Sequence, residues 1–373
     1  MATATKALEV GIEIPRSRGP SCEVSMPRSS SLPLSIVTAL LNRATSVSGI
    51  APYSTVRKST LCQSLAQHSF TTNQDLQRRA KNAPQGAFLA IDFVMVPHAG
   101  LEMEGLNFHY SGQARTQLGH QFTSAALVKF GADPTPLLER FTVSRLLETA
   151  AYPYRTATQE MIHTVTQCRE AGVSIAGVLL DGEFGRDEVV TFSHDTQIPV
   201  LVRAKRNMSV EVEGECLTLN ALAQRFPPER CHLYAEVGWR VRRLPVSRDV
   251  GAFDVLIIWR KVHGEWSCFF LFSTFDPAVT VRALLRAWKA RWGIEVIHRL
   301  MKQNLGLGRC RCRTIQAQDN WAWCVVEALH AVLLVRQEQP QLAWRAAQRR
   351  AAQHTEWYVL TEVQPVAQQR HAA

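Results

Sequence analysis

Two short apolar runs, each followed by an aspartate, constrain the fold of this 373-residue chain more than any other feature. Residues 87–91 lead into Asp92, and residues 173–180 lead into Asp181. Apolar runs of this length, with glycine nearby, are typical of buried strands. Between them, residues 158–171 have the apolar spacing of a helix and end at a glycine. This strand–helix–strand order predicts an α/β domain whose sheet is partly parallel.

The rest of the chain adds helices at both ends and a β-rich insertion. Apolar residues at helical spacing predict a small helical region before residue 86. Residues 207–275 are rich in β-branched and aromatic residues between turn signals, which predicts an antiparallel β insertion. The other predicted strands are 106–110, 122–130 and 199–202, and the other predicted helices are 188–194, 276–304 and 321–335.

These patterns divide the chain into six segments. In order, they are a flexible arm (1–34), a helical region (35–85), the first part of the α/β domain (86–206), the β insertion (207–275), the second part of the α/β domain (276–335) and a basic tail rich in alanine and glutamine (336–373).

Charge and cysteine usage limit the partners and the compartment. The 42 basic and 32 acidic residues give a net charge of +10, which favours a polyanion such as nucleic acid without requiring one. No apolar run reaches the ~18 residues of a membrane helix, and the N-terminus does not resemble a signal peptide. Nine cysteines, with Cys310 and Cys312 too close for a typical zinc pair, indicate free thiols in a reducing cytosol. We therefore expect a cytoplasmic protein without a membrane partner.

Four residues of the predicted helix 276–304 share one face. With about 100° of rotation per residue, Trp288, Arg291 and Lys302 all lie within about 40° of Glu295. A solvated face would have a similar mixture of charges, but the bulky indole beside one acid and two bases is less ordinary. The apolar stripe that should pack on the sheet consists of Ala283, Ala287, Ala290, Ile294, Ile297 and Met301.

The two aspartates are candidates for the same site as Glu295. Ligands of open α/β sheets bind where strands end, although an aspartate at such a position is often only a turn or helix cap. Three carboxylates together would suit two magnesium ions, which prefer oxygen ligands.

The sequence resembles a known family at these residues. The pattern Trp288-x2-Arg291-x3-Glu295-x6-Lys302 is similar to the Tyr-x2-Arg-x3-Glu-x6-Lys signature of bacterial insertion-sequence transposases of the fourth family. Asp181 also precedes a glycine and, two residues later, an aromatic residue, as the second family motif does. The resemblance covers residues 86–313. The sequence departs from the family pattern at three positions: Trp288 replaces the family's Tyr, and Glu183 and Phe93 stand where the family commonly has other residues.

The resemblance implies a fold, an activity and a catalytic set. The fold would be a ribonuclease-H-like mixed sheet flanked by helices, with the β insertion and the N-terminal helical region described above. Asp92, Asp181 and Glu295 would be both catalytic residues and metal ligands for two Mg²⁺ ions, with Mn²⁺ able to substitute. The enzyme would cleave DNA at the ends of a mobile element and join them to a target, in many members through a hairpin.

The resemblance also implies DNA contacts and partners. Double-stranded DNA at element ends and target would bind, with residues 35–85 holding the ends and two copies of the chain forming the synaptic complex in the bacterial nucleoid. The residues expected to contact DNA are Trp288, Arg291, Lys302, Arg203, Lys205 and Trp266.

Several of these assignments have alternatives. Arg203 and Lys205 could equally form a solvated basic turn, and Trp266 could be a packing residue of the sheet. Arg309, Arg311 and Arg313 alternate after the helix and would meet backbone phosphates or solvent. The alternatives to a transposase are a structure-specific nuclease of the same fold and a decayed or domesticated copy that only binds DNA.

Overall fold

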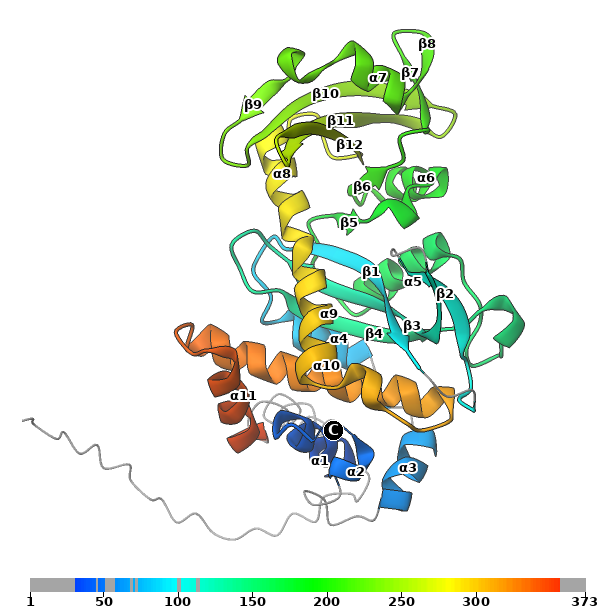
Figure 1. Cartoon of the computed structure of the whole chain (residues 1–373), viewed down its shortest axis with the longest axis vertical. Coiled ribbons are helices and arrows are strands. Elements are labelled where there is room, and N and C mark those ends of the chain that lie inside the picture. Colours follow the sequence, from blue (N-terminus) through cyan, green and yellow to red (C-terminus); the bar gives the residue numbers. More distant parts are fainter. Residues whose placement is uncertain are drawn as a thin grey trace, which may run out of the picture.

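A computed structural model describes residues 31–44, 46–50, 58–67, 70, 73–98, 102–111 and 115–355. The chain forms a large mixed sheet flanked by helices (Figure 1). This α/β class confirms the expectation from the sequence. Most of the expected arm (1–34) and the end of the expected tail (336–373) lie outside the described residues.

One sheet contains all the described strands, in the order β2-β3-β1-β5-β6-β12-β11-β10-β7-β8, with β4 paired to β3 and β9 to β10. The strands are β1 (Phe88–Pro97), β2 (Asn107–Ser111), β3 (Arg115–Val128), β4 (Thr135–Thr142), β5 (Val178–Leu180), β6 (Val200–Ala204), β7 (Ser209–Val212), β8 (Glu215–Thr218), β9 (His232–Tyr234), β10 (Trp239–Arg248), β11 (Gly251–Val262) and β12 (Glu265–Ser273).

The first half of the sheet is consistent with a ribonuclease-H-like fold. Strands β1, β3 and β4 are antiparallel neighbours, whereas β5 and β6 run parallel to β1 and to each other. Helix α5 (Ala157–Glu170) connects the two halves, and Thr156 begins it with a capping box. The strand–helix–strand order of the sequence therefore produces the expected parallel pairing.

The β insertion continues the main sheet instead of forming a separate one. Strand β12 pairs antiparallel with β6, and β11 and β10 follow outward from it. The edge of the catalytic sheet is therefore covered by hydrogen bonds to the insertion, and the two are joined through backbone pairing.

Helices cover both faces of the sheet. Helices α5 and α6 (Asp187–Thr196) pack on one face, and α9 (Trp292–Asn304) and α10 (Ile315–Glu338) pack on the other. The other helices are α1 (Ser31–Leu41), α2 (Val47–Ile50), α3 (Lys58–Gln67), α4 (Asn73–Ala80), α7 (Leu219–Arg225), α8 (Val281–Ala290) and α11 (Trp344–Gln353), with short 3₁₀ turns η2 (Arg145–Leu147), η3 (Gly182–Phe184), η4 (Pro228–Arg230) and η5 (Leu307–Arg309).

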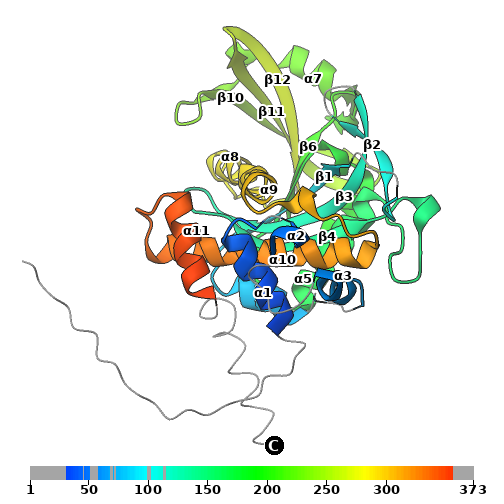
Figure 2. The same ribbon diagram turned by 60° about the horizontal axis from the view of Figure 1, so that its bottom comes forward.

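The N-terminal helices share a core with the catalytic region. Helices α1 and α3 lie against α10 (Figure 2), and Leu40 and Leu65 belong to the same buried cluster as Trp321 and Val332 of α10. The described helices of this N-terminal segment are therefore packed onto the rest of the molecule.

Three local expectations were wrong. The expected helix 276–304 begins only at Val281, with Thr280 as its N-cap, and is divided at Arg291 into α8 and α9. Ala283 of the expected apolar stripe is exposed, whereas the other stripe positions are buried. Strand β4 was not expected, because its inward-facing Glu139 interrupts the apolar pattern.

A buried ionic cluster holds α4 against α10. Glu327 of α10 is 1% exposed and accepts hydrogen bonds from the guanidinium groups of Arg78 and Arg79. These two cations lower the pKa of Glu327 to about 2 despite its burial. Arg79 also donates to the carbonyl of Leu137 in β4, so the cluster joins three elements.

We expect Glu327→Ala to lower the free energy of unfolding by about 3–5 kcal/mol, because it removes the buried carboxylate that both Arg78 and Arg79 contact. Denaturant unfolding would measure the loss. The control is Glu215→Ala, which breaks the exposed ion pair with Arg225 and should cost about 1 kcal/mol or less. Equal losses in the two variants would contradict the role of the buried cluster.

Candidate functional site

Asp92 projects from the middle of the sheet toward α9. It lies inside β1, and it follows Ile91, the last residue of β1 that pairs with β5. Side chains alternate along a strand, so Asp92 faces the same side as Ala90 and Val94, which belong to the cluster that packs on α9 and α10. The prediction that Asp92 stands at the exit of a strand was wrong: β1 continues to Pro97 because it pairs with β3 along its whole length, whereas its pairing with β5 ends at Ile91.

Asp181 lies on the neighbouring strand at the equivalent level. It follows Leu180, which pairs with Ile91, and it precedes the turn η3. Alternation with Leu179, another residue of the α9-side cluster, directs Asp181 to the same face as Asp92. Its Oδ1 atom is buried and has no hydrogen-bond partner among the described residues.

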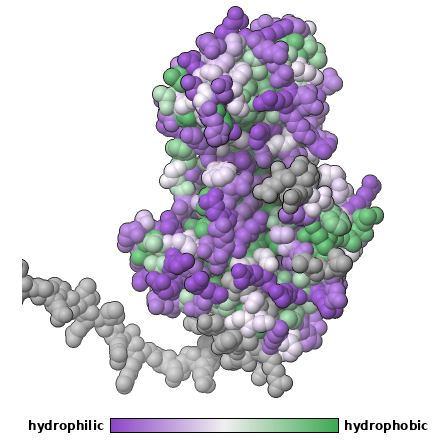
Figure 3. All heavy atoms as spheres, in the orientation of Figure 1, coloured by the Kyte–Doolittle hydropathy of each residue, from purple (hydrophilic) through white to green (hydrophobic). Residues whose placement is uncertain are grey.

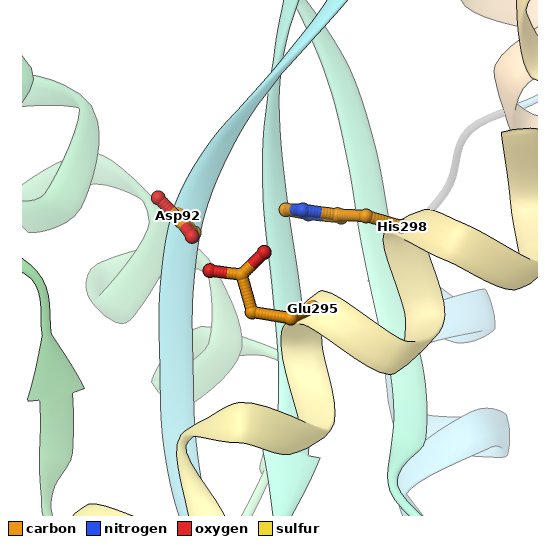
Figure 4. Close-up of side chains that lie close together, drawn as sticks. All are labelled: Asp92, Glu295 and His298. Atoms are coloured by element: carbon orange, nitrogen blue, oxygen red, sulfur yellow. The ribbon is translucent and has the colours of Figure 1, made fainter. Parts of the chain in front are cut away.

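Helix α9 brings an acid and a histidine above Asp92. Glu295 and His298 are three residues apart, so they lie one above the other on one face of the helix. One ligand atom from each of Asp92, Glu295 and His298 lies within 4.8 Å of the other two (Figure 4). Asp181 is outside this group.

Close approach of α9 makes this geometry possible. Gly293, in the first turn of α9, lies so close to β3 and the following loop that an added Cβ would be 3.0 Å from Val128 and 3.1 Å from Pro134. A larger residue here would push the helix, and Glu295 with it, away from the sheet.

The crowded carboxylates change the pKa of Asp92. Burial, followed by the charge of Glu295, raises it to about 7, and Asp181 adds a smaller effect in the same direction. Arg291 opposes the rise: its Nη1 atom lies 3.7 Å from Asp92 Oδ2 and 3.9 Å from Glu295 Oε1. One guanidinium thus lies between two acids at the break between α8 and α9.

His298 is a neutral imidazole with a free nitrogen. It is 7% exposed, and burial together with Lys302 and Arg291 lowers its pKa to about 3. Its Nε2 atom is buried and has no hydrogen-bond partner in the part of the chain that the structure describes. Neutral histidine is the form that binds metals.

These side chains fit a divalent cation. Asp92, Glu295 and His298 offer three ligand atoms within coordination reach of a shared ion, and Asp181 adds a buried unpaired oxygen on the next strand. A cation between them would relieve the repulsion that raises the pKa of Asp92.

An aromatic and cationic pocket adjoins the acids. It has a volume of about 220 Å³, and its lining is Trp239, Trp288, Lys289, Arg291 and Trp292. Lys289 Nζ lies 5.4 Å from the ring centre of Trp239, and Arg291 Cζ lies 5.0 Å from that of Trp288. Arg291 therefore links this aromatic pocket to the carboxylates.

Residues 146–330 match the transposase DDE domain. This match supports a DDE transposase. It includes Asp181 and Glu295 and begins after Asp92, so the first acid is connected to the domain by the geometry above. No curated protein matches the chain significantly.

The other sequence-predicted residues of the transposase site lie at different distances from the acids. Arg203 of β6 lies beside the turn after Asp181, because Leu180 pairs with Val202. Lys205 follows the same strand and is exposed. Lys302 lies two turns along α9 from Glu295, and burial lowers its pKa.

Trp266 lies away from the aromatic pocket. It alternates on β12 with Cys268 and Phe270, which pack in the cluster on the α5 and α6 side of the sheet. Trp239, which the sequence did not single out, faces α8 and stacks edge-to-face with Phe269 at 5.6 Å. The Nζ atom of Lys261 lies 5.4 Å from the centre of the Trp266 ring.

The sequence did not predict three residues near Asp92 and Glu295: His298, Trp292 and Glu139. His298 could have been found from its spacing of three residues from Glu295, but single histidines on a helix rarely indicate a site. Glu139 is buried on β4, two strands from Asp92. Ser124 of β3 lies between them: it pairs with Asp92 in the sheet, and its hydroxyl donates a hydrogen bond to the Glu139 carboxylate. Burial raises the pKa of Glu139 to about 8.

We expect Asp92→Asn to stabilise the metal-free protein more at pH 8 than at pH 5. The folded pKa of about 7 exceeds the ordinary 3.8, so protonated Asp92 favours folding at low pH and that contribution is lost as pH rises through 7. This pKa shift limits the gain in the free energy of unfolding to about 4 kcal/mol. Asparagine keeps the uncharged form at all pH values.

Melting temperatures of the two proteins without divalent ions, from pH 5 to pH 8, would measure the effect. Asp195→Asn, on the exposed side of α6, is the matched control and should shift the melting temperature equally at each pH. Parallel curves for wild type and Asp92→Asn would argue against the crowding of charge around Asp92.

Proposed function

We propose that this protein is a DNA transposase that cleaves DNA at the ends of a mobile element and transfers the freed strand into target DNA. The observation that carries this proposal is the approach of Asp92, Glu295 and His298 within 4.8 Å, inside a chain that matches a transposase DDE domain. Asp181, on the neighbouring strand, completes the proposed acidic set. The proposed assignment to the fourth insertion-sequence family rests on the signature around Glu295.

Asp92, Asp181 and Glu295 would hold two divalent cations, Mg²⁺ or Mn²⁺. When bound, such cations activate the attacking oxygen and stabilise the leaving oxygen at phosphorus. The protein's part is to position ligands: β1 and β5 hold the two aspartates on one face, and α9 holds Glu295 above them. His298 adds a neutral ligand, or a hydrogen-bond partner for a water molecule, at the same point.

Arg291 would exchange roles when DNA and cations bind. Its guanidinium lies between Asp92 and Glu295, where it partly neutralises them. Because guanidinium also binds phosphate in a bidentate manner, it could contact the DNA backbone once cations neutralise the acids. Hydrophilic side chains gather over α9 on the face seen in Figure 3, which suits a DNA path along this helix.

The aromatic pocket would receive a base displaced from the DNA end. Trp288 and Trp292 offer ring faces for stacking, and Lys289 and Arg291 offer charges for the neighbouring phosphates. Trp292 is 57% exposed, an unusual exposure for so large an apolar ring. Lys302, Arg203 and Lys205 would contact phosphates on either side of the acids.

The proposed partners are double-stranded DNA and a second copy of the chain in the synaptic complex, in a bacterial cytoplasm. The proposal includes no membrane partner. Among the described residues, no helix is both long and apolar enough to cross a membrane.

Glu295→Gln is the direct test of the activity. The substitution keeps the shape of the side chain but removes a charge needed for the cations, so we expect cleavage to fall below detection while DNA binding stays within about twofold. The substrate is DNA from both sides of the gene, with Mg²⁺ or Mn²⁺, and the readouts are cleavage and strand transfer into a plasmid. Cleavage at the wild-type rate by Glu295→Gln would refute the mechanism.

Glu188→Gln, on the exposed side of α6, is the matched control and should remain active. A protein that cleaves these ends but never joins them to the plasmid would be a nuclease.

We expect Trp292→Ala to lower end cleavage about tenfold without changing the melting temperature by more than 1–2 °C. Base–aromatic stacking is worth ~1–3 kcal/mol, whereas an exposed ring contributes little to folding. Trp288 is half-buried and packs against the α9-side core, so Trp288→Ala should lower both activity and stability. Trp288→Tyr should retain most of the activity. Normal cleavage by Trp292→Ala would exclude stacking at this position.

A further inference from the structure

A second concave site lies at the far end of α9. After Asn304 the chain turns through Gly306, whose φ of 71° favours glycine, into η5. Gly308 lies so close to β1 that an added Cβ would be 2.9 Å from Val96 Cγ1. These two glycines fold the segment back over the sheet and bring Arg309 and Arg311 beside the N-terminal helices.

The resulting pocket has a volume of about 370 Å³. The described residues of its lining are two arginines, two serines and a glycine: Ser46, Ser48, Gly308, Arg309 and Arg311. The serines come from the segment around α2, and the arginines come from the segment after α9. We call this the serine–arginine pocket.

Its polar groups are available for a ligand. Within the described part of the chain, neither Arg309 nor Arg311 takes part in an ion pair, whereas Arg313 pairs with Glu102. The hydroxyl oxygen of Ser46 accepts a hydrogen bond from the Gly49 N–H, so its own proton remains free to donate.

We infer that the serine–arginine pocket binds a backbone phosphate of the DNA whose end lies at the acids. This inference rests on the proposed function. Two guanidinium groups and two hydroxyl groups around one hollow are donors suited to a phosphodiester. The described residues that line the pocket include no acid and no aromatic ring.

The position of the pocket matches a continuous DNA path. The aromatic pocket lies at the first turn of α9, and the serine–arginine pocket lies just beyond its last turn. The 13 residues of α9 span about 20 Å, which corresponds to about six base pairs of B-form DNA. One duplex along α9 could therefore reach both pockets.

The pocket also connects two regions that are distant in sequence. A phosphate held by Ser46 and Arg309 would bridge the N-terminal helices and the catalytic region. Binding at this point would therefore engage both regions with a single phosphate.

The test measures the salt dependence of binding a 30-base-pair duplex in the absence of divalent ions. Each lost phosphate contact lowers the slope of log K against log salt by about 0.9, so Arg309→Ala/Arg311→Ala, which removes the contact with one phosphate, should lower the slope by about one. Ser46→Ala/Ser48→Ala should weaken binding severalfold with an unchanged slope, because a hydroxyl carries no charge.

Arg345→Ala/Arg349→Ala on α11 is the charge-matched control, since both side chains are exposed and the same charge is lost. Its slope should stay close to that of the wild type. An equal fall in both arginine pairs would mean general attraction to DNA and would overturn the pocket, as would an unchanged slope in Arg309→Ala/Arg311→Ala.

The binding test is separate from the test of activity. A protein that binds through Arg309 and Arg311 but never cleaves would refute the proposed function and leave the phosphate site intact. A protein that cleaves normally, with an unchanged slope in the Arg309→Ala/Arg311→Ala variant, would refute the phosphate site alone. A wild type that fails to bind any duplex would refute both.

Discussion

The burial of closely spaced acids is the constraint on which the rest of this structure depends. Strand alternation and helix packing direct Asp92, Asp181 and Glu295 to one side of the sheet. Burial, followed by the charge of Glu295, raises the pKa of Asp92 to about 7, and Asp181 adds a smaller effect. The surrounding protein tolerates this cost with Arg291 between two of the acids and with tight packing of α9 on β1 and β3. Because a cation would offset these buried negative charges, the arrangement favours cation binding.

The sequence predicted the elements that follow a local period, and missed those decided by distant contacts. Apolar runs were enough to place Asp92 and Asp181 on buried strands or at their ends, and helical spacing was enough to put Glu295 beside Arg291. No proline at Arg291 indicates that the long helix divides there. His298 becomes a candidate ligand only because the fold brings Asp92 close to it. The pairing of β12 with β6 joins residues about seventy positions apart, which no local pattern encodes. Likewise, Trp239 and Trp266 look equivalent in sequence, and only the register of the strands separates their faces.

The N-terminal helices are better regarded as part of the catalytic body than as a tethered module. Their apolar residues belong to the core around α10, and Arg78 and Arg79 reach Glu327 inside it. Helix α10 is consequently a shared support, with β4 on one side and α1 and α3 on another. Substitutions in the N-terminal helices would therefore disturb the packing of the sheet. Loss of activity in such a variant need not mean loss of a DNA contact.

The continuity between β6 and β12 has a consequence for how such proteins can evolve. A shortened chain that lost β7 to β12 would leave β6 with a row of unpaired amide and carbonyl groups, which is a template for association with other strands. The insertion is thus both a wall of the aromatic pocket and a cover for the catalytic sheet. Any relative that dispenses with it must protect that edge by another means, such as a charged or proline-containing border, a covering helix or a partner subunit.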